Sequence, residues 1–285
     1  MSRIGVQAST IRDEFLTHGP YETLRKMAEV GFRSVEMSQV PMDVENVAQM
    51  KRARDDFDIE FAALSAPLDP PAAGGDSLSE TMDKIIEDCR TLGSSFVRIG
   101  MLPVRALKSK EGVLDFARRA DQAFLELAEH DITLCYHNHH YEFARMDGQF
   151  ILDLIREAAP NLRFQIDLHW VHRGGIDPLK LLQDYAEVTD LIHLKDYRIG
   201  RLGDDVFEAL EAGDSSVFRN AMFTVVQFAE VGEGSLDFPA LIEASRAIGA
   251  KHLLVEQDST YDRTPFESLK VSYDNLVKMG YQDLM

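Results

Sequence analysis

Short apolar segments typical of β-strands alternate with amphipathic helix patterns from one end of the chain to the other. The clearest helix pattern, from Val113 to Ala128, carries its apolar residues on one face, as expected of a helix that covers a core. Strict alternation with short connections predicts a parallel sheet, and eight such units predict closure into a (β/α)₈ TIM barrel of the α/β class. A doubly wound open sheet is the alternative, but no Gly-x-Gly-x-x-Gly motif follows any strand. The expected strands span 4–9, 34–37, 59–64, 96–99, 132–136, 163–167, 190–194 and 252–256.

A single domain is expected to account for residues 1–285, because barrels of this class often use such a length as one domain. No linker divides the sequence. Only the segment 196–231, after the seventh strand, breaks the alternation. We expect an extended loop there, with short helices at 206–212 and 217–221.

Composition narrows the classes of partner. The formal charge of −18 repels phosphate backbones, so no nucleic acid is expected as a partner. No apolar run approaches the ~18 residues of a membrane helix, so no membrane is expected either. Cys89 and Cys135 lie in apolar patterns and are expected to be buried free thiols. With no room for a signal peptide before the first strand, the chain is predicted to be cytoplasmic.

The segment Leu134–Phe143 concentrates ionisable side chains at one strand end. Its apolar part is followed directly by His137, His139 and Glu142. Burying such groups is costly unless a partner pairs with them, and a divalent metal with a polar substrate would do so.

Other predicted strands end in the same way. Because the carboxyl ends of barrel strands meet at one mouth, these side chains are expected to share a site. Two glutamates, one aspartate and one histidine suit Mn²⁺ or Co²⁺, with Mg²⁺ or Zn²⁺ as alternatives. Three carboxylates on a dication leave one negative charge, which favours neutral ligands. The strand-end residues are Glu36, Asp167 with His169, His193 with Lys195, and Glu256.

Five motifs in order resemble the xylose isomerase-like barrel proteins, usually described as sugar phosphate isomerases/epimerases. The motifs are Tyr-His-Asn-His-His-Tyr-Glu-Phe at 136–143, Gln-Ile-Asp-Leu-His-Trp at 165–170, His-Leu-Lys-Asp-Tyr at 193–197, Val-Gly-Glu-Gly-Ser-Leu-Asp at 231–237 and Val-Glu-Gln-Asp at 255–258.

The resemblance implies a metal quartet on strands five to eight, which maps to Glu142, Asp167, His193 and Glu256. Many relatives carry the first glutamate at the strand end itself, where this chain has His137. Either Glu142 folds back to the metal or His137 replaces it. We expect Glu142 to be the ligand.

The resemblance also implies the chemistry, which is proton transfer next to a carbonyl through a metal-stabilised enediolate. The leading hypothesis is an isomerase or epimerase of a sugar or keto-polyol, with Mn²⁺ as the expected metal. The alternatives are a dehydratase or lyase acting on a keto-inositol or 3-keto-sugar, an abasic-site endonuclease, and a non-catalytic sugar-binding subunit. An unphosphorylated substrate is favoured because no glycine-rich anion cradle follows strand seven or eight. A homodimer or larger homo-oligomer is a further expectation.

Roles follow for the individual side chains. Acid–base catalysis is assigned to Glu142, Glu256, His137 and His139, and substrate contacts are assigned to His169, Lys195, Glu36 and Trp170.

Overall fold

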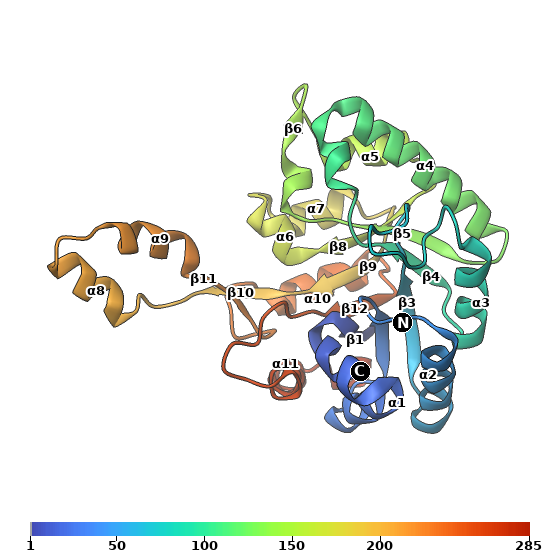
Figure 1. The fold of residues 1–285 in the computed structure, drawn as a ribbon, viewed down its shortest axis with the longest axis horizontal. Coiled ribbons are helices and arrows are strands. Elements are labelled where there is room, and N and C mark those ends of the chain that lie inside the picture. The colour runs from blue at the N-terminus through green and yellow to red at the C-terminus, as the bar shows by residue number, and fades with distance from the viewer. Residues whose placement is uncertain (1) are drawn as a thin grey trace.

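The computed structural model describes residues 2–285, and eight parallel strands in it close into a barrel in the order β1-β12-β9-β8-β5-β4-β3-β2 (Figure 1). The prediction of a (β/α)₈ barrel is confirmed, with each strand near its expected position. Within these residues, no helix is long and apolar enough to cross a membrane. The barrel strands are β1 (Arg3–Gln7), β2 (Ser34–Met37), β3 (Glu60–Ser65), β4 (Phe96–Ile99), β5 (Thr133–His137), β8 (Arg163–Asp167), β9 (Thr189–Leu194) and β12 (His252–Val255).

Helices surround the barrel and bury one face each. α1 consists of two helical segments that join across a kink at Gly19, whose φ is 76°. α4 places the predicted apolar stripe, including Phe116 and Leu127, against the strands. The barrel helices are α1 (Arg12–Val30), α2 (Val44–Phe57), α3 (Met82–Leu92), α4 (Lys110–Ala128), α5 (Ile151–Ala158), α6 (Leu168–Arg173), α7 (Pro178–Asp184), α10 (Phe238–Ala247) and α11 (Pro265–Lys278). Single-turn 3₁₀ segments are η1 (Ala8–Ile11), η2 (Val104–Lys108), η3 (His140–Phe143) and η4 (Gln282–Leu284), and β6 (Arg145–Met146) pairs with β7 (Gln149–Phe150).

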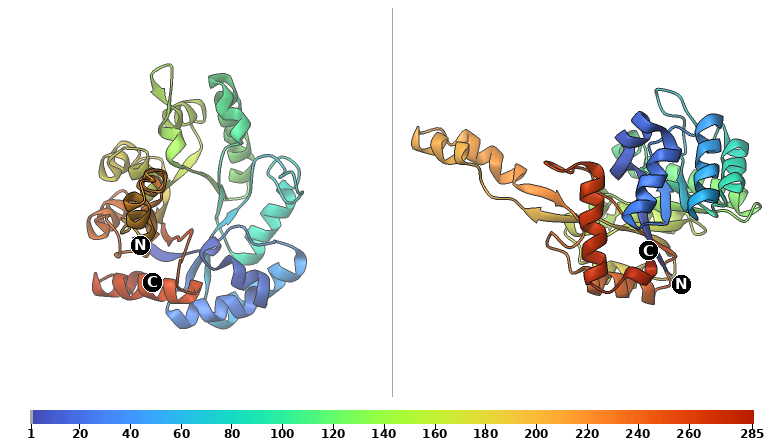
Figure 2. Two further views of the ribbon diagram at one scale, coloured as in Figure 1. Left: turned by 60° about the vertical axis from the view of Figure 1, so that its left-hand side comes forward. Right: turned by 90° about the horizontal axis from the view of Figure 1, so that it is seen from below.

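The segment expected as an extended loop is an ordered arm. β10 (Asp196–Ile199) and β11 (Val226–Ala229) form an antiparallel ribbon that carries α8 (Asp204–Glu211) and α9 (Ser216–Thr224) at its end. Figures 1 and 2 show this arm standing away from the barrel. The two short helices were predicted within a few residues, but the ribbon was not, because nothing local in the sequence pairs residue 196 with residue 229.

The register of the strands brings distant residues to one level of the barrel. Asp167 pairs with His193 across β8 and β9, and His193 pairs with Leu254 of β12. The chain then continues to Glu256, whose N–H donates to the carbonyl of Leu194 at 3.1 Å. Side chains from three strands therefore converge at the carboxyl end of the barrel, where function is concentrated in this fold.

Candidate active site

Four buried side chains meet at this end of the barrel and form what we call the strand-end cluster: His137, Asp167, His193 and Glu256. One ligand atom from each lies within 4.8 Å of the others. His137 ends β5, Asp167 ends β8, His193 lies in β9 and Glu256 directly follows β12. Three of the four expected ligands are thus brought together, and the fourth member is His137.

His137 has the proton arrangement of a metal ligand. Its Nδ1 lies 3.2 Å from the carbonyl oxygen of Gly100, which can only accept, so Nδ1 carries the proton and Nε2 is bare. Nε2 lies 3.5 Å from Oδ2 of Asp167, and within residues 2–285 neither atom has a hydrogen-bond partner. Burial lowers the pKa of His137 to about 4, which keeps the ring neutral at pH 7. A bare nitrogen beside an unpaired carboxylate oxygen, both buried, fits a bound cation.

His193 and Glu256 are held by hydrogen bonds. Nδ1 of His193 lies 2.8 Å from Oε2 of Glu256, and its Nε2 lies 3.3 Å from Oε1 of Glu36. Burial alone would lower the pKa of His193, but the carboxylates of Glu256 and Glu36 raise it well above its usual value. Burial would raise the pKa of Glu256, but Lys195 and His193 hold it well below its usual value. Without a cation, the protonated imidazole of His193 therefore balances these carboxylates.

Glu142 does not join the cluster, which corrects the metal-ligand role expected of it. It lies in η3, where its carboxylate accepts hydrogen bonds from the hydroxyl of Tyr136 at 2.5 Å and from the backbone N–H of His139 at 2.9 Å. The second bond is half of a capping box with the His139 side chain. Burial raises the pKa of Glu142 to about 7. The carboxylate of Glu142 is thus used in hydrogen bonds to nearby residues. We infer that Glu142 stabilises the turn that carries His139.

The presence of His137 in the cluster, in place of Glu142, changes the charge of the site. The cluster contains two carboxylates and two imidazoles, in place of the three carboxylates expected from the sequence. A dication held by this set leaves no net charge, and the ammonium of Lys195 beside it is paired with the carboxylate of Asp258. The electrostatic argument against an anionic substrate, which assumed three carboxylates, therefore no longer applies.

Glu36 was expected to contact substrate, but the structure encloses it behind the cluster. Its carboxylate accepts hydrogen bonds from Arg98 Nε at 2.8 Å and from the side-chain amide of Gln165, and it faces His193. Burial would raise the pKa of Glu36, but Arg98 and His193 lower it to about 2. Glu36 is therefore interpreted as a positioning residue and not as a substrate contact, since it is fully buried and its carboxylate faces the ring of His193.

Arg98 and Gln165 were missed by the sequence analysis. Arg98 lies in β4, where the other residues are apolar, Gln165 lies between Phe164 and Ile166 in β8, and both are buried. The sequence contained one signal for Arg98, which is a charged residue inside the four-residue strand Phe96–Ile99. Because an unpaired guanidinium is too costly to bury, such a residue indicates a buried partner.

Lys195 lies at the cluster, as the substrate-contact prediction requires. Its Nζ lies 2.8 Å from Oε2 of Glu256, 2.9 Å from Oδ2 of Asp258 and 3.5 Å from Oδ2 of Asp167. It also lies 5.1 Å from the centre of the Trp170 ring. A buried ammonium with these partners stays charged at neutral pH and offers hydrogen bonds to an oxygen-rich ligand.

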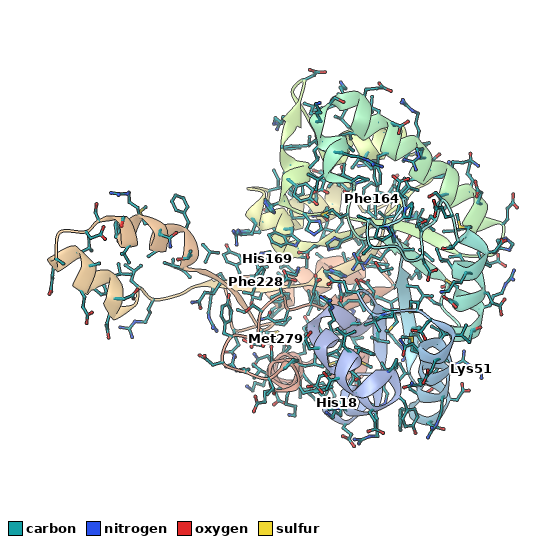
Figure 3. All side chains as sticks on the ribbon, in the orientation of Figure 1. His18, Lys51, Phe164, His169, Phe228 and Met279 are labelled. Atoms are coloured by element: carbon teal, nitrogen blue, oxygen red, sulfur yellow. The ribbon has the colours of Figure 1, made fainter. Side chains whose placement is uncertain are left out.

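His169 and Trp170 supply unpaired polar atoms next to Lys195. Both ring nitrogens of His169 and the indole nitrogen of Trp170 are buried and have no hydrogen-bond partner within residues 2–285. The ring of His169 packs against Phe228 of β11, with 5.2 Å between centroids, so the base of the arm forms part of the wall (Figure 3). These atoms are available for substrate hydroxyl groups.

His139 lies at the mouth, half-buried beside the cluster. Its ring is 4.8 Å from that of His137 and is stacked on Tyr141. Burial and the neighbouring His137 lower its pKa to about 3, so its imidazole is neutral at pH 7.

The family of the chain follows from a comparison with protein-family models. The model described as xylose isomerase-like TIM barrel matches residues 24–272. The chain belongs to this family. No curated protein matches the sequence closely.

Solved structures share the fold of this family member at low identity. A sugar phosphate isomerase/epimerase from Parabacteroides distasonis is 20% identical, with a TM-score of 0.75 and 99% of each chain covered. An L-ribulose 3-epimerase is 16% identical, with a TM-score of 0.67 and coverage of 100% of this chain and 96% of that one. A probable 3-DHS dehydratase from Bacillus anthracis is 16% identical, with a TM-score of 0.66 and coverage of 97% and 99%. At these identities the likeness establishes the fold, and isomerases, epimerases and a dehydratase all occur on it.

Proposed function

We propose that this chain is a divalent-metal-dependent isomerase or epimerase that acts on a sugar or keto-polyol through an enediolate. The strand-end cluster is the observation that supports the proposal. It gathers two carboxylates and two imidazoles from the ends of four separate strands. Within residues 2–285, His137 Nε2 and Asp167 Oδ2 have no hydrogen-bond partner. Neutral core packing gives no reason to bury these atoms together.

His137, Asp167, His193 and Glu256 would hold the metal. Two nitrogen and two oxygen donors without a thiolate suit Mn²⁺, Co²⁺ or Zn²⁺ better than Mg²⁺, which prefers an all-oxygen shell. When bound, the metal supplies Lewis-acid polarisation of a carbonyl and its neighbouring hydroxyl, which acidifies the C–H bond between them.

The proton is moved by residues of this chain. Burial opposes the charge of Glu256, but Lys195 and His193 keep it ionised, and its carboxylate is assigned as the acceptor of the proton from the substrate carbon. His139 is the neutral base on the side of the mouth. His137 does not move a proton in this scheme, because its Nδ1–H is engaged by Gly100. Return of the proton to the neighbouring carbon gives an isomer, and return to the opposite face gives an epimer.

Lys195 supports a second outcome at the same site. Its charged ammonium lies at the cluster, where it can donate a hydrogen bond to a departing hydroxyl. Loss of a β-hydroxyl from the same intermediate gives a dehydratase or lyase acting on a keto-inositol or 3-keto-sugar.

The test is solvent-deuterium incorporation across a panel of ketoses, keto-inositols and 3-keto-sugars, after metal analysis of the purified protein. Deuterium at the carbon next to the carbonyl, together with a new epimer or a new aldose–ketose isomer, supports the leading proposal. Enone absorbance without either of these products indicates the dehydratase. Equal sugar binding by metal-free and Mn²⁺-loaded protein, with no exchange on any substrate, contradicts both and indicates a binding subunit.

Metal affinity is predicted to rise with pH. His193 has a raised pKa in the metal-free protein and must lose its proton to act as a ligand, so protons compete with the metal. Below that pKa the affinity should increase by up to about tenfold per pH unit, with release of up to about one proton per ion. Calorimetric titration with Mn²⁺ at two pH values, in buffers of different ionisation enthalpy, measures both. Binding with no proton release would contradict the assignment of His193.

A further inference from the structure

The arm, residues 196–229, is a built feature with a fixed base. The carboxylate of Asp196 accepts hydrogen bonds from the backbone N–H groups of Tyr197, Gly234 and Ser235 at 2.8, 2.9 and 3.1 Å. A side chain at Gly234 would collide with that carboxylate and with the carbonyl of Tyr197. The ribbon then continues in register from Asp196 opposite Ala229 to Ile199 opposite Val226. Its direction away from the barrel is therefore set by specific contacts (Figures 1 and 2).

The outer part of the arm leaves its apolar side chains in water. α8 buries only Val206, and α9 buries no residue, so the two helices use little of their apolar surface on each other. Five of the eleven exposed large hydrophobic residues in the described chain lie in this short segment, which is far more than its share. They are Ile199, Phe207, Leu210, Met222 and Phe223, with exposed fractions of 62%, 51%, 40%, 56% and 80%.

Such an arm needs a cover to be stable. A two-stranded ribbon in water is marginal by itself, and monomeric proteins rarely leave apolar patches of this kind exposed. We propose that the arm pairs with the arm of a second copy of this chain around a two-fold axis. A homodimer is the simplest cover, because the partner is present wherever the chain is and the same apolar patch serves both copies.

The exposed area is sufficient for a dimer. At roughly 200 Å² for each fully exposed large side chain, the five residues offer about 600 Å² per copy. Two copies together would bury roughly 1,200 Å² before any polar surface is counted, which is the size at which specific interfaces begin.

Charge determines the direction of pairing. The outer helix α8 is acidic, with Asp204, Asp205, Glu208 and Glu211 and no basic residue. The part of the arm that precedes α8 carries two arginines, Arg198 in β10 and Arg201 just after it, which we call the arginine segment. Parallel arms would place the acidic helices side by side, whereas antiparallel arms place each acidic helix along the arginine segment of the other copy. The dimer is therefore antiparallel.

The test is the mass of the full-length protein in solution, measured by light scattering and sedimentation at roughly micromolar concentration. Wild type is expected to be a dimer. The double variant Met222→Asp/Phe223→Asp is expected to be a monomer, and Arg201→Glu is expected to weaken the dimer by about tenfold. The control is Val44→Asp on α2, because Val44 is 85% exposed but lies outside the arm. It should remain a dimer.

A second variant tests the same proposal in case the doubly substituted chain does not fold. Residues 200–225 are replaced by Asn-Gly, which retains the ribbon from Ile199 to Val226 and the site wall at Phe228. A monomer that still unfolds in one cooperative transition supports the proposal. A monomeric wild type, or a shortened or doubly substituted chain that dimerises as well as wild type, overturns it.

Discussion

Asp167→Ala is expected to remove tight metal binding and to lower turnover by about 10³-fold or more. Asp167 contributes the unpaired Oδ2 at the centre of the strand-end cluster, within 3.5 Å of His137 Nε2 and 3.8 Å of His193 Nδ1. The neighbouring carboxylates are already engaged: Glu256 is a cluster member, Arg98 binds Glu36, and Lys195 binds Asp258. Metal content of the purified variant and deuterium exchange with the substrate identified for wild type measure the two effects.

A pair of variants separates the two possible ligand sets. His137→Ala should lower metal affinity strongly, because it removes the bare Nε2. Glu142→Gln should retain the metal and most activity, since this carboxylate binds Tyr136 and the backbone of its own turn. The assignment fails if Glu142→Gln loses the metal while His137→Ala keeps it. Circular dichroism of both variants excludes unfolding as the cause of either loss.

Most of the barrel could be predicted because its signals are local. Each strand is a short apolar run, each helix has its own stripe, and alternation alone implies parallel closure. Asp167, His193 and Glu256 could be identified for the same reason, since each follows an apolar run directly. The position of a strand end is then sufficient to place a side chain at the mouth.

The roles of Glu142 and Glu36 could not be predicted from the local sequence. Glu142 was assigned by matching residue type to the family quartet, but five residues separate it from the strand end and its own turn supplies hydrogen bonds. Glu36 does end a strand, yet it binds Arg98, 62 residues away, and Gln165, 129 residues away. Contacts at such separations depend on the closed barrel and leave no periodic trace. The ribbon of the arm was missed for the same reason.

Replacing Arg98 with methionine is expected to destabilise the protein by about 3–5 kcal/mol. Arg98 and Glu36 are both buried, and removing the guanidinium leaves a carboxylate without its main counter-charge. The double variant Arg98→Met/Glu36→Gln should recover most of this loss, because a neutral amide needs no counter-charge. The exposed pair between Arg25 and Glu22 is the control, and Arg25→Met should leave the free energy of unfolding unchanged. Urea unfolding at pH 7 measures all three.

The pH dependence of the free energy of unfolding provides an independent check of the predicted effect of Arg98→Met. The pKa of Glu36 is lowered from 4.5 to about 2 in the folded protein, where burial opposes and Arg98 favours the ionised form. A depressed carboxyl pKa contributes stability above the unfolded pKa, and this contribution is lost as the pH falls through the folded pKa. The stability difference between wild type and Arg98→Met should therefore be full at pH 7 and shrink between about pH 4.5 and pH 2. A difference that stays constant across this range would mean that Arg98 acts by packing alone, and the orientation of His193 would then not depend on the charge of Glu36.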